Sequence, residues 1–169
     1  MIPSNIILVG FMGTGKTTVG KLLAQKLNKR FVDMDSVIEE RAGKAISRIF
    51  MEEGEPRFRA MERALVQELA AKVGLVIATG GGIVLNQDNI ADFSRTGKVV
   101  CLMADEDEIM RRVSGSNSRP LLEKDDKLQR IRSLMEQRRP LYEKIPDRVN
   151  TTGLTPEQVV EAIAPMLNP

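Results

Sequence analysis

The segment from Gly10 to Thr17 reads GFMGTGKT and has the residue types that a phosphate-binding loop requires. Its glycines let the backbone wrap closely around an anion, and they tolerate the positive φ angles that turn several N–H groups toward it. At this spacing Lys16 can reach the outer phosphates of a nucleotide, and Thr17 can offer a hydroxyl to Mg²⁺. An apolar run before the loop and a helical pattern after it complete the required context. We therefore predict that residues 10–17 bind a nucleotide.

Two carboxylates, Asp33 and Asp35, flank Met34 after a second apolar run. In an extended segment, residues two apart face the same side. One carboxylate can then hold Mg²⁺ through water while the other accepts a hydrogen bond from a substrate hydroxyl. The alternative is a helix N-cap before Ser36, but a position beside the phosphate-binding loop favours the site.

Two further features indicate an anionic substrate. The triplet Gly80-Gly81-Gly82 follows a buried run, and it predicts either a tight turn or a stretch of N–H groups presented to an anion. Arg138 shares a helix face with Ile131 and Met135, whereas Arg139 turns away. A charge on an apolar face needs a partner, so we expect Arg138 to point into the site, with snorkelling to solvent as the alternative.

Arg59 lies three residues before Glu62 in the helix predicted to begin near Pro56. The pair can be an exposed ion pair on the helix surface. It can equally be a device in which Glu62 holds the guanidinium rigid, so that Arg59 grips a carboxylate through two hydrogen bonds. Both interpretations are compatible with the spacing.

The segment from Ser114 to Pro120 consists mainly of turn-forming residues and carries Arg119. It can be an ordinary surface connection. Beside a phosphate-binding loop we instead predict a lid. Phosphoryl transfer requires that water be excluded and that positive groups neutralise the negative charge of the phosphates as the site closes.

Composition limits the remaining possibilities. The 169 residues suit one globular domain, and 25 basic against 23 acidic residues give no support for a nucleic-acid partner. No apolar stretch is long enough to cross a membrane, and the single cysteine, Cys101, suits a reducing cytoplasm. The chain has no histidine, so a general base must be another group.

Short apolar runs alternate with helical periodicity, which predicts an α/β fold with a parallel sheet covered by helices on both faces. We expect the strands to span 5–10, 30–33, 74–79, 97–103 and 147–150. Helices are expected directly after the phosphate-binding loop, from about Ser36, from Pro56 to about Lys72, and after Thr155, which caps the last one.

Missing motifs narrow the class of nucleotide-binding protein. A GTPase would carry Asn-Lys-x-Asp, but Asn28-Lys29 continues to Arg30-Phe31. Motor and transporter ATPases usually have an apolar strand that ends in aspartate, whereas the run 75–79 ends in glycines. A small kinase that acts on a metabolite fits best.

Taken together, the residues resemble the shikimate kinase family over nearly the whole chain. The resembling segments are Gly10–Thr17, Phe31–Asp35, Gly54–Arg59 with Glu62, Gly80–Gly82, Arg119–Leu122 and Arg138–Tyr142. This family phosphorylates the 3-hydroxyl of shikimate with ATP and Mg²⁺, on the pathway to chorismate and the aromatic amino acids. The resemblance implies a three-layer fold with a five-stranded parallel sheet in the order 2-3-1-4-5. It also implies one kinase domain over residues 1–169, with a substrate-binding helical segment at about 34–61 and a lid at about 112–126.

The resemblance also implies roles for individual residues. Lys16, Asp35 and Arg119 match catalytic positions, Thr17 matches the Mg²⁺ ligand, and Asp33 assists the metal through water. The nucleotide-binding positions are Gly13, Thr14, Gly15, Lys16, Thr17, Thr18, Arg112 and Arg119. The shikimate-binding positions are Asp35, Arg59, Gly80, Gly81, Gly82 and Arg138. The family's adenine loop corresponds to Asn150–Pro156.

Two alternatives remain open at this stage. One is a related small-metabolite kinase for gluconate or a nucleoside monophosphate, and the other is a catalytically inactive nucleotide-binding regulatory domain. We expect a cytoplasmic monomer whose partner is a small molecule, with neither a nucleic acid nor a membrane as a partner.

Overall fold

The computed structural model describes residues 3–114 and 121–168, except for the side chains of 121–125. A five-stranded parallel sheet with the order β2-β3-β1-β4-β5 forms its centre. The strands are β1 (Asn5–Gly10), β2 (Arg30–Asp33), β3 (Leu75–Ala78), β4 (Gly97–Met103) and β5 (Arg148–Asn150). The sheet type and strand order are those expected from the sequence.

Eight α-helices and one short 3-10 helix are found in the described part of the chain. The helices are α1 (Lys16–Leu27), α2 (Met34–Ala42), α3 (Ile46–Glu53), α4 (Glu55–Ala70), α5 (Gln87–Thr96), α6 (Glu106–Ser114), α7 (Leu121–Glu143) and α8 (Pro156–Leu167). The 3-10 helix η1 spans Ile83–Leu85. None of the described helices is both long and apolar enough to cross a membrane.

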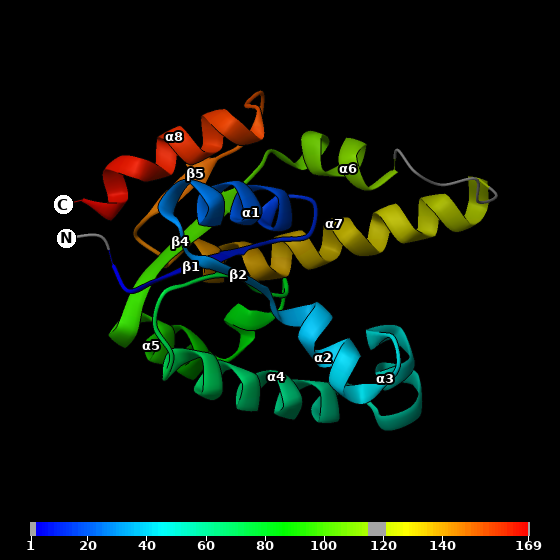
Figure 1. Ribbon diagram of the computed structural model, residues 1–169. Helices are drawn as coiled ribbons and strands as arrows, with labels where there is room; N and C mark the ends of the chain where they lie inside the picture. The colour runs from blue at the N-terminus through cyan, green and yellow to red at the C-terminus, as the bar shows by residue number, and fades with distance from the viewer. Residues whose placement is uncertain (1–2, 115–120, 169) are drawn as a thin grey trace.

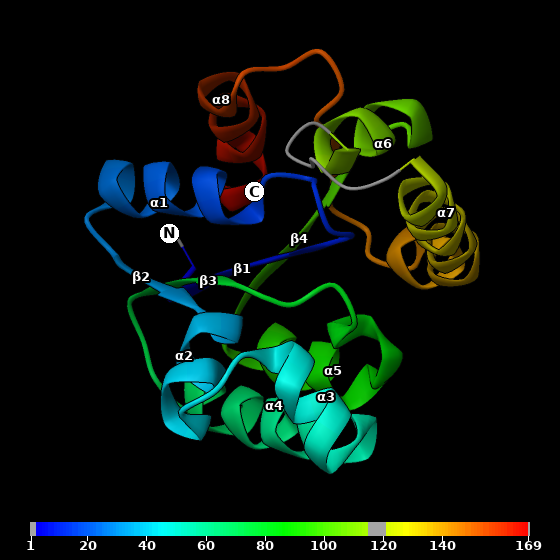
Figure 2. The same cartoon turned by 90° about the vertical axis from the view of Figure 1, so that its right-hand side faces the viewer.

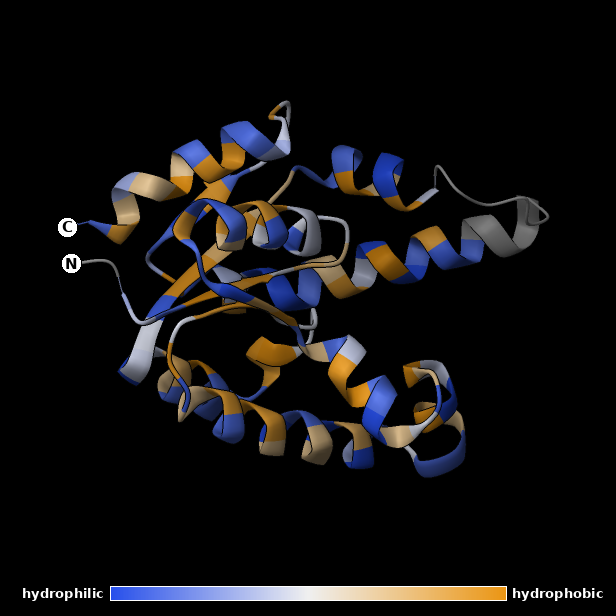
Figure 3. Cartoon of the chain, in the orientation of Figure 1, coloured by the Kyte–Doolittle hydropathy of each residue, from blue (hydrophilic) through white to orange (hydrophobic). Residues whose placement is uncertain are grey.

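The sheet separates two apolar cores, as alternating side chains on a buried strand require. Ile6 and Leu8 of β1 pack with residues of α1 and α8, whereas Ile7 and Val9 pack with residues from α2 to α5 and from α7. Figure 2 shows α1 and α8 on one side of the sheet and α2 to α5 on the other. Apolar segments line the inner surfaces of these layers (Figure 3). The predicted three-layer arrangement is confirmed.

The carboxyl ends of the parallel strands share one edge of the sheet. In Figure 1 the chain termini lie at the left, and this edge faces right, where α3, α6 and the start of α7 project. The loops after β1, β2 and β3 therefore converge at this edge, which is where open α/β sheets bind ligands. The predicted phosphate loop and the glycine triplet lie in the connections after β1 and β3, and Asp33 and Asp35 lie where β2 passes directly into α2.

Two local expectations require correction. The second helix begins at Met34, so Asp35 lies in its first turn and not in an extended segment beside Asp33. The helix from Ile46 to Glu53 had no counterpart among the expected elements. Its apolar residues are too few to give a long periodic pattern, and Gly54, with φ of 85°, separates it from α4 after only eight residues.

Candidate active site

The loop between β1 and α1 has the conformation that phosphate binding requires. Gly13 and Gly15 have φ angles of 78° and 92°, which favour glycine. Gly15 is the N-cap of α1 and has no side chain to occupy the first N–H groups of the helix, so these groups suit an anion. The Thr14 side chain turns inward, and its hydroxyl donates to the Phe11 carbonyl over 2.7 Å, which stabilises the loop through a hydrogen bond within it.

Lys16 lies at the centre of this loop. Its Nζ donates to the carbonyl oxygens of Gly10 and Phe11, at 2.5 and 3.0 Å. Burial lowers the pKa of Lys16 to about 8, although the negative charge of Asp35 acts in the opposite direction. A phosphate at this position would compete for the ammonium group and favour its charged form.

Asp33 is the N-cap of α2 and also contacts the phosphate loop. Its Oδ1 caps α2 by accepting from the Ser36 backbone N–H over 3.2 Å. Its Oδ2 accepts from the Thr17 hydroxyl over 3.0 Å. A hydroxyl and a carboxylate beside the phosphate loop are oxygen donors of the kind that Mg²⁺ prefers, so these two residues fit a metal held jointly with a nucleotide.

Asp35 borders the glycine triplet. A Cβ atom on Gly80 would lie 2.8 Å from Oδ1 of Asp35, so only glycine allows this approach. Oδ1 is buried and has no hydrogen-bond partner among the described residues. Burial, reinforced by the charge of Asp33, raises the pKa of Asp35. An orphaned oxygen of this kind suits a donor supplied by a ligand, such as a hydroxyl group.

The burial and contacts of Glu62 distinguish between the two interpretations of its pair with Arg59. The Glu62 side chain is only 2% exposed, and its Oε1 accepts from Arg59 Nη1 over 3.0 Å. Oε2 is buried and unpartnered within the described residues, and it would lie 3.4 Å from a Cβ on Gly80. Burial raises the pKa of Glu62 against the opposing effect of Arg59. The pair is therefore an internal device that fixes the guanidinium, not an exposed ion pair.

The rest of the glycine triplet leaves space for two arginines. A Cβ on Gly82 would lie 2.7 Å from Cζ of Arg59, so the guanidinium packs directly on this glycine. A Cβ on Gly81 would meet no atom closer than Nη1 of Arg138 at 3.6 Å, with the Met12 backbone nitrogen at 3.7 Å. Gly81 therefore lies between Arg138 and the phosphate loop, in close reach of both.

Arg138 points into the site, as its helix face predicts. Its charge acts on the pKa values of Lys16, Glu62 and Tyr142, so it lies close to all three side chains. The Tyr142 hydroxyl in turn donates to the Gly81 carbonyl, and burial raises the pKa of Tyr142 to about 12. Tyr142 thus links α7 to the glycine triplet and fixes the position of Arg138.

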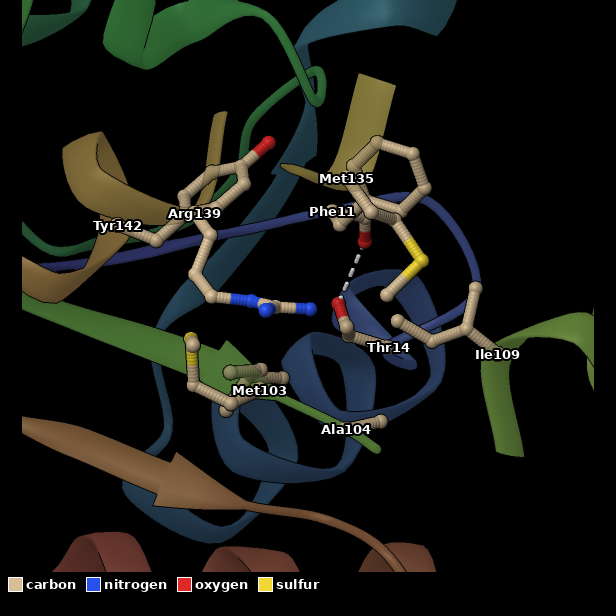
Figure 4. Close-up of a pocket in the computed structure, with 9 residues that line it drawn as sticks. Phe11, Thr14, Met103, Ala104, Ile109, Met135, Arg139 and Tyr142 are labelled. Atoms are coloured by element: carbon tan, nitrogen blue, oxygen red, sulfur yellow. Dashed lines mark hydrogen bonds between the residues drawn. The ribbon is translucent and has the colours of Figure 1, made fainter. Parts of the chain in front are cut away.

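Arg139 turns away from Arg138 and enters a different small pocket. Figure 4 shows its side chain extending beside Tyr142 and Met103 toward Thr14. The other walls are mainly apolar, and include Phe11, Ile109 and Met135. The pocket therefore lies behind the phosphate loop, on the side to which the Thr14 side chain points.

A separate pocket of about 330 Å³ adjoins the outer side of the phosphate loop. This volume lies near the lower end of the range of about 300–1,000 Å³ for small-molecule sites. The residues that line it come from the phosphate loop with α1, from α6, and from the connection between β5 and α8, and they include Gly13, Gly15, Thr18, Arg112, Thr151, Leu154 and Pro156. It is the place expected for the base of a bound nucleotide.

The structure thus brings most of the predicted residues together. Lys16, Asp35, Arg59 and Arg138 converge around Gly80–Gly82, while Arg112 and Thr18 line the second pocket. Arg119 and most of the predicted lid lie outside the described residues. Within the described residues, no group of three or more acidic or cysteine side chains could hold a metal by itself.

Of two further residues of this site, Glu62 was left undecided by the sequence and Tyr142 was missed. Glu62 shares the spacing of Phe58, Leu65 and Leu69, which marks the buried face of α4. Tyr142 follows Arg138 by four residues and therefore lies on the same helix face. Each pattern was present in the sequence, but neither indicates by itself which polar group the side chain meets.

We predict that nucleotide affinity depends on the ionisation of Lys16. The ammonium group has a pKa of about 8 in the ligand-free protein, and a bound phosphate raises it, so the complex binds more protons. Calorimetry with ADP should therefore give a constant affinity below pH 7.5 and a loss approaching about tenfold per pH unit above 8. The Lys16→Arg variant, whose charge does not titrate in this range, should bind more weakly but with a flat profile. A wild-type profile that is flat up to pH 10 would contradict this prediction.

Comparison with known proteins agrees with the geometry. The family model described as shikimate kinase matches residues 12–168. The shikimate kinase of Thermodesulfovibrio yellowstonii is 48% identical over 159 residues, which cover 94% of this chain and 92% of that relative. The structure of the Acinetobacter baumannii shikimate kinase in complex with shikimate superposes with a TM-score of 0.87 at 36% identity, covering 97% of this chain and 92% of the other.

Kinases with other acceptors share the fold at much lower identity. The match with a gluconokinase from Sinorhizobium meliloti spans 98% of this chain and 94% of the gluconokinase. Its TM-score is 0.63, but the sequences are only 16% identical. This likeness shows the fold alone, and it does not favour gluconate as the acceptor. The family match and the close relatives, together with the site geometry, show that this chain belongs to the shikimate kinase family.

Proposed function

We propose that this enzyme transfers the terminal phosphoryl group of ATP to the 3-hydroxyl of shikimate, giving shikimate 3-phosphate and ADP for chorismate and aromatic amino acid biosynthesis. One observation carries the assignment of the acceptor site. Two arginines and an unpartnered carboxylate oxygen surround the glycine triplet, directly opposite the phosphate loop. A hydroxylated carboxylate is the ligand that this set of groups complements.

On the acceptor side, we assign the substrate carboxylate to Arg59 and Arg138. The Arg59 guanidinium is held by Glu62, so little side-chain freedom is lost when it binds. Asp35, whose Oδ1 has no partner among the described residues, is the acceptor for a substrate hydroxyl. The substrate-binding segment, residues 34–61, then comprises α2, α3 and the start of α4.

On the donor side, we assign the phosphates to the loop residues Gly13, Thr14, Gly15 and Lys16 and to the start of α1 at Thr17 and Thr18. Thr17, with Asp33 acting through water, is proposed to hold Mg²⁺, because their oxygens are 3.0 Å apart at this position. Bound there with ATP, Mg²⁺ neutralises phosphate charge. Arg112 is assigned to the nucleotide side through its place in the adjoining pocket.

Catalysis is proposed to rest on positioning and charge. Phosphoryl transfer has a loose transition state, so the main contributions are an in-line hydroxyl and positive charge at the phosphate oxygens. Lys16 supplies charge from the loop, and Arg119 is proposed to supply more from a lid at about residues 112–126. Asp35 orients the hydroxyl and takes its proton late in the transfer, which a raised pKa favours.

The whole chain is proposed to act as a single-domain monomer in the cytoplasm. Both halves of the proposed site are built from one chain, and its only cysteine, Cys101, is free and buried. Burial raises the pKa of Cys101 to about 12, so this thiol is inert. Sedimentation of the purified protein would test the monomeric state.

A panel of acceptors tests the reaction itself. We expect ADP release with shikimate and ATP, and no release above background with gluconate or nucleoside monophosphates. Lys16→Ala should abolish turnover while circular dichroism reports an intact fold. Turnover with another acceptor but not with shikimate would refute the assignment, and normal kcat in the Lys16→Ala variant would refute the role of the loop.

Removing Arg138 should weaken shikimate binding specifically. We expect Arg138→Ala to lose about 1.5–3 kcal/mol of binding free energy, the usual value of a hydrogen bond to a charged group. Arg132→Ala is the matched control, because Arg132 lies on the same helix but pairs with Glu106 over 2.6 Å, away from the site. Kinetics at saturating ATP should show a raised shikimate KM only in the first variant; an unchanged KM there would exclude Arg138 from the site.

Gly82→Ala should disturb Arg59 without unfolding the protein. The new Cβ would lie 2.7 Å from Cζ of Arg59, and this flexible side chain can move where backbone could not. We expect the shikimate KM to rise roughly tenfold or more, the cost of misplacing one charged hydrogen bond. The KM for ATP and the melting temperature should change little. Equal effects on both KM values would show that the substitution disturbs the site as a whole.

A further inference from the structure

Arg112 joins three segments of the nucleotide side through one guanidinium group. Its Nη1 donates to the Gly13 carbonyl over 2.9 Å and to Thr151 Oγ1 over 3.2 Å, and its Nη2 donates to the Thr151 carbonyl over 3.3 Å. Gly13 belongs to the phosphate loop, Thr151 follows β5, and Arg112 itself lies in α6. These bonds therefore set the spacing between the two loops that line the pocket next to the phosphates.

The two segments that Arg112 joins are themselves well fixed. Thr151 is buried, and both its N–H and its hydroxyl donate to the Met103 carbonyl at the end of β4. Gly13 lies close to α6, since a Cβ there would be 3.2 Å from Cγ1 of Val113. A shift of the Arg112 side chain would therefore move the phosphate loop or break its hydrogen bond to the Gly13 carbonyl.

Glu108 sets the orientation of this guanidinium from one helical turn away. Its Oε1 accepts from Arg112 Nε over 2.9 Å, at i,i+4 spacing. The Glu108 side chain is only 16% exposed, and Arg111 holds it through two further hydrogen bonds, at 2.6 and 3.0 Å. These hydrogen bonds, chiefly those from Arg111, lower the pKa of Glu108, so it stays ionised near neutral pH.

Glu108 and the two loops accept from different nitrogens of Arg112. Nε is directed to Glu108, while Nη1 and Nη2 are directed to Gly13 and Thr151. A guanidinium is planar, so bonds in its plane fix the orientation of that plane while leaving its faces unoccupied. Loss of the Nε contact would release the side chain to rotate and to exchange its loop contacts for water.

From this geometry we propose that Glu108 is a positioning residue for the nucleotide, which acts through Arg112 to hold the phosphate loop and the connection after β5 at the spacing that nucleotide binding requires. The proposal rests on the donor side of the proposed function and does not depend on the identity of the acceptor. Glu108 also lines the pocket next to the phosphate loop, and a double-mutant cycle with Arg112 separates its action through that residue from a direct contact.

Variants of Glu108 test the proposal through ADP binding, measured by calorimetry without shikimate. Glu108→Ala should weaken ADP binding about tenfold, the effect of one charge-assisted hydrogen bond. At saturating shikimate it should raise the KM for ATP by a similar factor, while the shikimate KM stays within about twofold and kcat falls less than the affinity. Glu108→Gln keeps an oxygen that can accept from Nε, and it should restore most of the affinity.

Glu68→Ala is the matched control. Glu68 accepts two hydrogen bonds from Arg41, both at 2.8 Å, and one from Lys72 at 3.3 Å, and neither partner is assigned to the nucleotide. Glu68→Ala therefore removes a comparable network of charged hydrogen bonds away from the nucleotide side, and its ADP affinity should be unchanged. Melting temperatures of all variants separate a change in stability from a change in affinity.

A double-mutant cycle with Arg112→Ala distinguishes positioning from an independent effect. If Glu108 acts through Arg112, Glu108→Ala should have no further effect on ADP affinity once Arg112 is absent. Additive losses, or equal increases in both KM values, would overturn the proposal. If wild type binds ADP but does not phosphorylate shikimate, the proposed function fails while the role of Glu108 is still measured.

Discussion

The buried carboxylate of Glu62 constrains the whole acceptor side of the site. A charge that is 98% removed from solvent is stable only if partners compensate it, and Glu62 has Arg59, three residues earlier in α4, and the field of Arg138 from α7. Its second oxygen borders Gly80, which lacks a side chain where Asp35 also approaches. The orientation of Arg59 and the need for glycine at position 80 therefore both involve this buried carboxylate.

The sheet topology brings this acceptor side to the nucleotide. β3 lies between β1 and β2, and parallel strands end at the same edge, so the connections that contain Lys16, Asp35 and Gly81 must meet there. The Tyr142 hydroxyl then attaches α7 to the Gly81 carbonyl, and Arg138, one turn earlier in α7, lies beside the same glycine. Residues more than a hundred positions apart in the chain become neighbours without any unusual backbone beyond the glycines.

Prediction from the sequence succeeded where the pattern is local. The phosphate loop, the strands and the Arg138 face depend on spacings within one element, and the family resemblance supplied the strand order. Prediction from the sequence failed at positions where a side chain contacts a second element. The extended interpretation of Asp33 and Asp35 was wrong because the Asp33 side chain itself caps α2 and starts the helix at Met34. Glu62 was left undecided because the spacing does not reveal that the glycine triplet covers that face.

The charges around the triplet also explain why an anionic acceptor suits the site. Lys16, Arg59 and Arg138 face two carboxylates, Asp35 and Glu62, and each carboxylate has a raised pKa because burial penalises its charged form. Arg138 lies 3.6 Å from the position of a Cβ on Gly81, so a substrate carboxylate beside this glycine would meet its positive charge. A neutral sugar would gain no such ion pair, so this cluster can discriminate between acceptors by charge.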